Sequence, residues 1–176
     1  MLLSQENKIF SLDPNTLNLS IVGSVQTHDK INDISSVDDK IYAVTASGNL
    51  CQWKQPNTFV YCKVTHAFNT TLVDAVNSSI VVTAGQDRNL KIWDSSAKNI
   101  ATFIYESRIK TITHSERFLA VGDGVGVVKL YAIENFAHFL SIKINGSIIG
   151  VKVLEELNLI AVLLESGSCR TYSLRG

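Results

Sequence analysis

The chain has no excess of either charge: 16 Lys and Arg residues balance 16 Asp and Glu residues over 176 positions. Proteins that bind nucleic acid usually carry a basic patch or stripe, so this balance argues against direct contact with nucleic acid. Long apolar runs are also missing, since none approaches the roughly 18 to 20 residues of a membrane-spanning helix. Gln5, Glu6 and Lys8 stand where a secretory signal would have its apolar centre. We therefore expect an intracellular protein, cytoplasmic or nuclear, without a membrane span.

Cysteine is scarce and unpatterned. Cys51, Cys62 and Cys169 are an odd number without a CxxC pair, which argues against a disulfide framework and against a thiolate zinc site. Cys51 and Cys62 could face each other across a hairpin, but two separate, half-buried thiols are the favoured interpretation. His114 and His138 have no acidic or Cys partner at ligand spacing. We expect no metal and no cofactor.

Proline occurs only twice, both times at predicted turns, and no stretch keeps a helical hydrophobic period. Short β-branched and aromatic runs alternate instead with Gly, Asn, Asp and Ser. The clearest case is Ser79 to Asp94, SIVVTAGQDRNLKIWD, in which Ile80 to Val82 is one run and Leu90 to Trp93 another. The turn residues Gly85 to Asn89 lie between them, so the stretch predicts a β-hairpin.

Weaker forms of this pattern recur around five aromatic anchors spaced 38 to 43 residues apart: Phe10, Trp53, Trp93, Tyr131 and Tyr172. The spacing is near the roughly 40 to 45 residues of a four-stranded propeller blade. We predict an all-β chain of antiparallel blades, with three full blades and two partial ones. The expected units are residues 1–27, 28–65, 66–105, 106–144 and 145–176, with the partial blades at the two ends.

The third unit resembles the WD-repeat (WD40) β-propeller family. Members of that family carry a hydrogen-bonded set of four side chains: a His before the first strand, a Ser or Thr on the second, an Asp in the turn after it, and a Trp on the third. His66, Thr83, Asp87 and Trp93 stand at those places. Such a set satisfies a buried indole and a buried imidazole, so the resemblance implies a structural role rather than a catalytic one.

The other units depart from the family pattern. The second keeps His28, Thr45 and Trp53 but has no Asp in its turn. The fourth has Tyr131 and no His before its first strand, and the last has only Tyr172. We expect the four-residue set in the third unit alone, while the blades themselves persist.

The number of strands predicts an incomplete ring. At about 40 residues a blade, the chain makes between four and five blades, and its two partial blades repeat their middle strands instead of completing each other. An open arrangement would expose sheet edges and blade faces, both of which favour association. We expect either a segment of a larger propeller or a chain whose missing blades come from a partner.

The resemblance implies a non-enzymatic scaffold for protein–protein interaction within a multiprotein complex. Two alternatives stay open: a subunit of a nucleic-acid-associated complex in RNA processing or chromatin, which would need a Lys/Arg stripe across blades, and an enzyme on a propeller scaffold, which would need convergent carboxylates or His residues. Candidate partner-binding residues lie in loops at the blade entries, which the topology places on one rim: Asp29, Lys30, Phe68, Asn69, Arg108 and Lys110.

Overall fold

The computed structural model is all-β, which confirms the predicted fold class, and it describes residues 1–13, 15–25, 29–55 and 57–175. Strands β1 to β18 make up nearly all of the regular structure in these ranges. They are joined by turns and by one short 3-10 helix, η1 (Glu155–Leu157). The expected blade entry at His28 and the turn prolines Pro14 and Pro56 lie outside the described residues.

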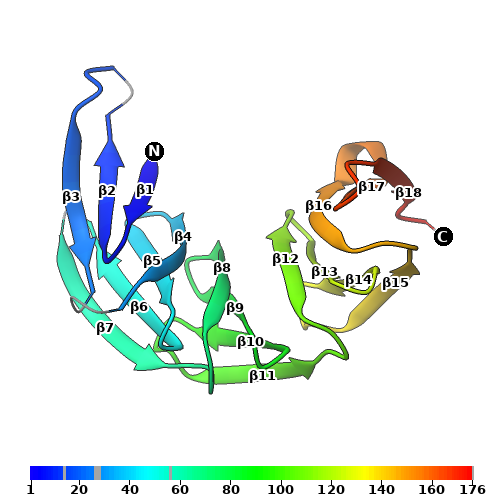
Figure 1. Cartoon of the computed structure of the whole chain (residues 1–176), viewed down its shortest axis with the longest axis horizontal. Helices are drawn as coiled ribbons and strands as arrows, with labels where there is room; N and C mark the ends of the chain where they lie inside the picture. Colours follow the sequence, from blue (N-terminus) through cyan, green and yellow to red (C-terminus); the bar gives the residue numbers. More distant parts are fainter. Residues whose placement is uncertain (14, 26–28, 56, 176) are drawn as a thin grey trace. The chain divides into compact units, whose positions relative to one another are not determined.

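Five antiparallel sheets follow one another along the chain (Figure 1). Sheet A contains β1 (Leu2–Gln5), β2 (Lys8–Leu12) and β3 (Leu19–Ser24). Sheet B contains β4 (Ile31–Val37), β5 (Lys40–Thr45), β6 (Asn49–Lys54) and β7 (Thr58–Val64). Sheet C contains β8 (Thr70–Asn77), β9 (Ile80–Gly85), β10 (Asn89–Asp94) and β11 (Asn99–Ile104).

The remaining two sheets lie in the second half of the chain. Sheet D contains β12 (Ile109–His114), β13 (Phe118–Asp123), β14 (Val127–Ala132) and β15 (His138–Lys143). Sheet E contains β16 (Ile148–Leu154), β17 (Leu159–Leu164) and β18 (Cys169–Ser173). Sheets A to C belong to one compact unit, Met1–Ile104, and sheets D and E to a second, Tyr105–Gly176.

Sheets B, C and D share one turn between their second and third strands. Gly48, Arg88 and Gly126 stand at the same place in it, and all three have positive φ. Glycine is required at two of these places for a second reason: a Cβ would lie 2.5 Å from the carbonyl oxygen of His66 at Gly48, and 1.9 Å from that of Ile144 at Gly126. The turn therefore brings the chain close to the loop that enters the next sheet.

Apolar side chains are buried between neighbouring sheets. Within Met1–Ile104, Trp53 of sheet B packs in one cluster with Ile9 of sheet A. Trp93 of sheet C packs in a second cluster with Tyr42 of sheet B. Each sheet thus uses the face of its neighbour to remove its own apolar surface from water.

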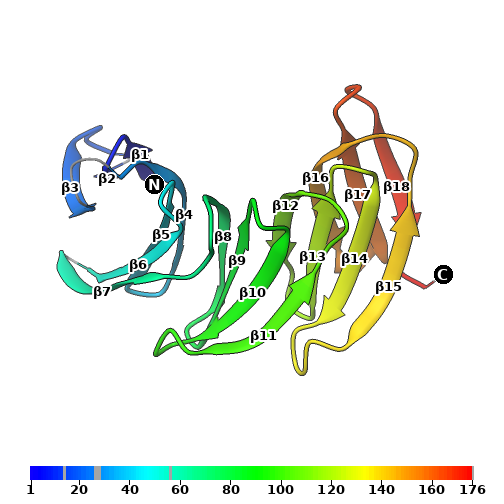
Figure 2. The ribbon, with the colours of Figure 1, turned by 60° about the horizontal axis from the view of Figure 1, so that its bottom comes forward.

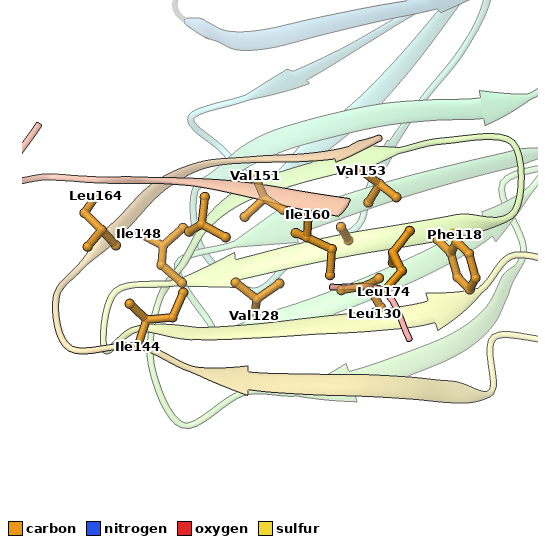
Figure 3. Close-up of a cluster of buried hydrophobic side chains, with 12 residues drawn as sticks. Phe118, Val128, Leu130, Ile144, Ile148, Val151, Val153, Ile160, Leu164 and Leu174 are labelled. Carbon is orange, nitrogen blue, oxygen red and sulfur yellow. The ribbon is translucent and has the colours of Figure 1, made fainter. Parts of the chain in front are cut away.

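The second unit has the same construction. Val128 and Leu130 of sheet D lie against Ile160 and Val162 of sheet E, and all four side chains are fully buried. Figure 3 shows the labelled members of this cluster pointing into the space between the two sheets, which are stacked in Figure 2.

The cysteines differ from expectation. Register places Cys51 of β6 directly opposite Cys62 of β7, and the structure joins the two by a disulfide, so the interpretation as separate thiols is wrong. Cys169 is free and exposed. Strand register, which decides whether two cysteines meet, could not be fixed to the residue from the sequence pattern.

Leu130→Ala tests the packing between sheets D and E. Leu130 is fully buried, so its truncation removes apolar contact and leaves a cavity, at a cost of about 2 to 5 kcal/mol in the free energy of unfolding. Urea unfolding followed by circular dichroism measures the loss. Leu157→Ala is the matched control, because Leu157 is 64% exposed, and it should cost less than about 0.5 kcal/mol. Equal losses for the two variants would contradict burial between the sheets.

Candidate functional site

Four polar or aromatic side chains of the third unit meet at one end of sheet C. His66 lies in the segment between β7 and β8, Thr83 is on β9, Asp87 is in the turn that follows, and Trp93 is on β10. The hairpin β9–β10 sets two of these positions, because Thr83 and Trp93 lie on paired strands whose register is fixed by the turn.

The four side chains form an unbroken chain of hydrogen bonds. Trp93 Nε1 lies 2.8 Å from Thr83 Oγ1, and Thr83 Oγ1 lies 2.8 Å from His66 Nε2. On the other side of the ring, His66 Nδ1 lies 2.9 Å from Asp87 Oδ1. Asp87 Oδ1 also accepts the backbone N–H of Asn89 at 3.1 Å. The set therefore connects a buried indole to the turn that follows β9.

Only one proton arrangement satisfies every member. The indole N–H can only donate, so Thr83 Oγ1 accepts from Trp93. An ionised Asp87 can only accept, so His66 Nδ1 carries the proton that it donates to the carboxylate. His66 Nε2 is then an acceptor and receives the Thr83 hydroxyl proton. The hydrogen bonds are thus donated in one direction, from Trp93 to Asp87, and this arrangement requires a neutral imidazole.

Burial supports the neutral imidazole. The exposed fractions of His66 and Thr83 are 1% and 0%. Burial lowers the pKa of His66 and outweighs the hydrogen bond and the charge of Asp87, which raise it. For Asp87, burial raises the pKa, but the hydrogen bonds from His66 and Asn89 outweigh it and hold the pKa below its usual range. The contact is thus a hydrogen bond from a neutral ring to a carboxylate.

The space around this set is full. A Cβ added at Gly85 would lie 2.6 Å from His66 Nδ1 and 2.8 Å from Asp87 Oδ1. No approach to the imidazole is left on that side. Because both ring nitrogens and the indole nitrogen have partners inside the set, its groups are arranged to hold each other in place and present no unused nucleophile or base.

Sheet B lacks part of the hydrogen-bonded set. By strand register, Thr45 corresponds to Gly85, and Ala43 corresponds to Thr83, which corrects the expected match of Thr45 with Thr83. Thr45 Oγ1 instead accepts the backbone N–H of Asn49 at 3.2 Å. The second unit therefore has no hydroxyl at the position that Thr83 takes in the third.

Asp29 takes part in the turn of sheet B. One of its carboxylate oxygens accepts the backbone N–H of Ser47 at 3.1 Å, and the other accepts the Ser47 hydroxyl and the Asn49 side-chain amide. Partial burial raises the pKa of Asp29, but these hydrogen bonds outweigh it and lower the pKa. Its carboxylate is occupied within its own blade.

Sheet D contains a pair that sequence reasoning missed. The hydroxyls of Tyr105 and Tyr131 lie 2.9 Å apart, and both side chains are buried. Burial raises the pKa of both hydroxyls. Tyr105 precedes the first strand of its sheet by four residues, as His66 does, and this spacing is the signal that could have identified it. Tyr105 and Tyr131 take the places of His66 and Trp93.

The anchors fall into two groups. Trp53, Trp93 and Tyr131 are each the fifth residue of their strands and are buried, and Tyr172 is partly buried against the sheet D and E cluster. Phe10 is the third residue of β2, and Leu12 is the fifth. Phe10 thus lies two residues nearer the start of its strand than Trp53, Trp93 and Tyr131 do.

The candidate rim residues lie in or next to the segments that enter β4, β8 and β12. Phe68 is 66% exposed, and Lys30, Arg108 and Lys110 are also exposed. Asn69 accepts a hydrogen bond from the side-chain amide of Asn32, which ties the entries of sheets B and C together. Phe68 is therefore an exposed side chain next to the hydrogen bond between Asn32 and Asn69.

A hollow of about 340 Å³ in the second unit is lined by Ser115, Glu116 and Val153 to Leu157. Glu155 within it accepts hydrogen bonds from the backbone N–H of Arg117 at 2.8 Å and from its Nε at 2.6 Å. Slight burial raises the pKa of Glu155, but hydrogen bonds from Ser115 and Arg117 outweigh it and lower the pKa. This carboxylate is held as an ion-pair partner.

Among the described residues, no group of three or more His, Cys, Asp or Glu side chains is arranged to hold a metal ion. No helix in those residues has the length and apolar character needed to cross a membrane.

The architecture is similar to solved structures of propellers. A chain in the crystal structure of the mitotic checkpoint complex matches with a TM-score of 0.87 and 10% identity, over 99% of this chain and 59% of that one. The WD40 β-propeller domain of Doa1 matches with a TM-score of 0.77 and 17% identity, over 98% and 62%. The fold is that of a β-propeller.

A computationally designed protein, Ika4, matches with a TM-score of 0.76 and 15% identity, over 86% of this chain and 96% of that one. At these identities the likeness concerns the fold alone. The chain spans about six tenths of the length of the two natural proteins named above. No protein-family model matches the sequence, and no curated protein does.

Thr83→Val tests the hydrogen-bonded chain. Valine keeps the shape but removes the hydroxyl, which leaves the Trp93 indole N–H and His66 Nε2 buried without partners. We expect a loss of about 2 to 4 kcal/mol in the free energy of unfolding, measured by urea denaturation. Thr58→Val, at an exposed strand position, should change it by less than about 0.5 kcal/mol. A loss no larger than that of the control would show that the Thr83 hydroxyl does not stabilise the folded chain.

The neutral imidazole predicts acid sensitivity. Because the pKa of His66 is lower in the folded chain than its ordinary value of about 6.5, the unfolded chain binds the proton more tightly. The stability due to this group is fully present above about pH 6.5 and falls as the pH decreases through the folded pKa. Urea unfolding at several pH values between about 8 and 5 measures the slope. His66→Gln should be less stable at about pH 8 and should show a shallower slope; an unchanged slope would contradict the assignment.

Proposed function

We propose that this chain is a WD-repeat protein that acts as a non-enzymatic scaffold for protein–protein interaction within a multiprotein complex, where a partner supplies further blades. The observation that carries the proposal is that the titratable side chains of the hydrogen-bonded set in the third unit, His66 and Asp87, already have hydrogen-bond partners within the set. His66 bonds to Asp87 through one ring nitrogen and to Thr83 through the other, and Gly85 closes the approach to the ring. A catalytic His would keep one nitrogen for a substrate.

Two features support the family assignment. The hydrogen-bonded set occupies the places that it has in WD repeats, and one of the similar structures is a WD40 β-propeller domain. Support for a role in assemblies comes from the other natural neighbour, which belongs to a structure of a protein complex. Function on such a fold depends on its surface, so the docking residues must be argued separately.

Phe68 is the best candidate for an anchor in the partner-binding rim. An exposed aromatic side chain next to a fixed backbone is typical of binding hot spots. Arg108 and Lys110 contribute exposed cations at the entry of sheet D. Asp29 is the weakest of the six candidates, since Ser47 and Asn49 already occupy its carboxylate. Equal numbers of acidic and basic residues favour a protein partner over a nucleic acid.

The double variant Phe68→Ala/Arg108→Ala tests this surface. The tagged full chain is expressed in its native cells, cross-linked in place and purified, and cross-linked peptides are quantified by mass spectrometry. We expect specific partner proteins to be cross-linked to the wild type and to fall by about tenfold in the variant, which is about 1.4 kcal/mol of binding free energy.

The matched control is Ile104→Ala/Arg170→Ala, which removes an exposed apolar residue and an exposed Arg from outer strands. It should leave the partners unchanged. If the Phe68 and Arg108 variant keeps all partners, the rim is not the docking surface. If the wild type has no protein partners, the scaffold function itself is wrong.

A further inference from the structure

One end of sheet D carries an excess of positive charge. It is formed by the segment that enters β12, the first residues of β12, the turn between β13 and β14, and the ends of β14 and β15 that lie beside that turn. Its basic residues are Arg108, Lys110, Lys129 and Lys143, and its acidic residues are Glu106 and Asp123. We call residues 106–110, 123–129 and 143 the basic end.

Two of these cations are held against the sheet. Lys143 Nζ donates a hydrogen bond to the carbonyl oxygen of Val125 at 2.7 Å. Lys129 Nζ lies 4.7 Å from the ring centroid of Tyr105, a distance at which an ammonium is attracted to the face of an aromatic ring. Both contacts keep the positive charges of the two lysines beside the turn, where they add to the local potential.

The acidic residue Asp123 is turned into the sheet. It is 2% exposed, and its Oδ1 accepts the backbone N–H of Val125 at 3.1 Å and that of Val127 at 2.8 Å. These hydrogen bonds use the carboxylate to fix the turn. Among the described residues, no ion pair joins Asp123 to a basic side chain. The exposed cations therefore outnumber the exposed acid of this end, Glu106.

Three hydrogen-bond donors at the entry of β12 have no partner in the described part of the chain. Arg108 and Lys110 are exposed, and Ser107 is half-buried. No side-chain hydrogen bond or ion pair is formed by any of the three within residues 1–13, 15–25, 29–55 and 57–175. The donors are a hydroxyl, a guanidinium and an ammonium, all of which bind a carboxylate.

Gly124 leaves room between two of these donors. A Cβ at Gly124 would lie 3.3 Å from Ser107 Oγ and 3.5 Å from Lys110 Cε, so both side chains border the same point next to the turn. The backbone N–H of Gly124 donates to the carbonyl oxygen of Arg108 at 3.0 Å, which fixes the turn to the entry segment. Positive φ occurs in this turn at Gly126 and not at Gly124, so the backbone conformation does not require glycine there. An acidic group that approaches this point comes within reach of a hydroxyl and an ammonium.

The corresponding turns of sheets B, C and E contain or bind an acidic group. In sheet E, Glu165 stands at the place of Gly124 by strand register. In sheet C, Asp87 lies in the turn, and in sheet B the carboxylate of Asp29 is bound to it. Among the described residues of these four sheets, only sheet D has no acidic side chain at the exposed part of this turn, residues 124–126. The excess of positive charge is therefore particular to sheet D.

The small extent of the basic end favours a protein over a nucleic acid as its ligand. Nucleic acid offers an evenly charged backbone, and proteins that bind it use a basic stripe that neutralises many phosphates. Here the excess is confined to one end of one sheet, and the whole chain has equal numbers of acidic and basic residues. A peptide segment with a few carboxylates matches such a site in charge.

We propose that the basic end of sheet D binds a segment of the partner protein that is rich in Asp and Glu. The guanidinium of Arg108 binds one carboxylate through two parallel hydrogen bonds. The Lys110 ammonium binds a second carboxylate beside Gly124, and the Ser107 hydroxyl donates to that same group. The two lysines held against the sheet add attraction at longer range. The inference rests on the proposed function, because it names the chemistry of the partner that docks on the rim.

Binding of an acidic probe by the purified full chain tests the site directly. The probe is a fluorescent hexaglutamate peptide, and fluorescence anisotropy measures its dissociation constant. We expect Arg108→Gln/Lys110→Gln to weaken binding by about tenfold. Raising the salt concentration from about 0.05 to 0.5 M should weaken binding by the wild type, because exposed charges are screened. Lys98→Gln/Arg170→Gln is the matched control, since it removes an exposed Lys and an exposed Arg, and it should bind like the wild type.

Cross-linking in lysates of native cells identifies the segment that docks. A water-soluble carbodiimide condenses a lysine amine with a carboxylate: an amide bond forms, and the water that is lost converts the carbodiimide to a urea. We expect mass spectrometry to find Lys110 of the tagged full chain joined to Asp or Glu residues of a partner protein. Arg108→Gln keeps this amine and should reduce the product by about fivefold, whereas Arg170→Gln should leave it unchanged.

Either of two results with the purified chain would overturn the proposal: the wild type does not bind hexaglutamate more tightly than the Arg108 and Lys110 variant does, or it binds a hexathymidylate oligonucleotide more tightly than hexaglutamate. Circular dichroism checks that each variant keeps its sheets. If partners are captured and none is joined to Lys110, the scaffold function stands and the acidic ligand is wrong. If hexaglutamate binds as expected and no partner protein is captured, the basic end binds carboxylates and the scaffold function fails.

Discussion

Burial between sheets is the constraint on which the rest of this structure depends. A single three- or four-stranded sheet cannot cover its own apolar faces, so each tryptophan anchor needs the sheet before it: Trp53 is covered from the side of Ile9, and Trp93 from the side of Tyr42. The free energy of folding is therefore distributed over pairs of sheets and not held in one central core. The same constraint explains why Ile160, Val162 and Leu164 of β17 are buried, since they lie on the face that packs against sheet D.

Within this arrangement, each blade still has to fix the turn between its middle strands and give its buried polar groups hydrogen-bond partners. The third unit does so with a one-directional chain of hydrogen bonds from the Trp93 indole to the Asp87 carboxylate. The fourth uses two tyrosine hydroxyls, and the second uses a carboxylate, Asp29, on its turn. In the third and fourth units these contacts give buried polar groups hydrogen-bond partners, whereas the Asp29 contacts fix a turn that water still reaches.

The blades were predictable because their signal is redundant. Each strand repeats β-branched and aromatic residues, turn residues separate them, and the 38- to 43-residue spacing of the anchors reinforces the pattern. The positions of His66, Thr83, Asp87 and Trp93 were found because these four residue types stand at the spacing of the WD-repeat pattern. Features that depend on exact register were missed. The match of Thr45 with Thr83 was two residues out, because Thr45 stands at the place of Gly85, and register also decides whether Cys51 meets Cys62. Tyr105 was missed because nothing in a lone tyrosine specifies its partner.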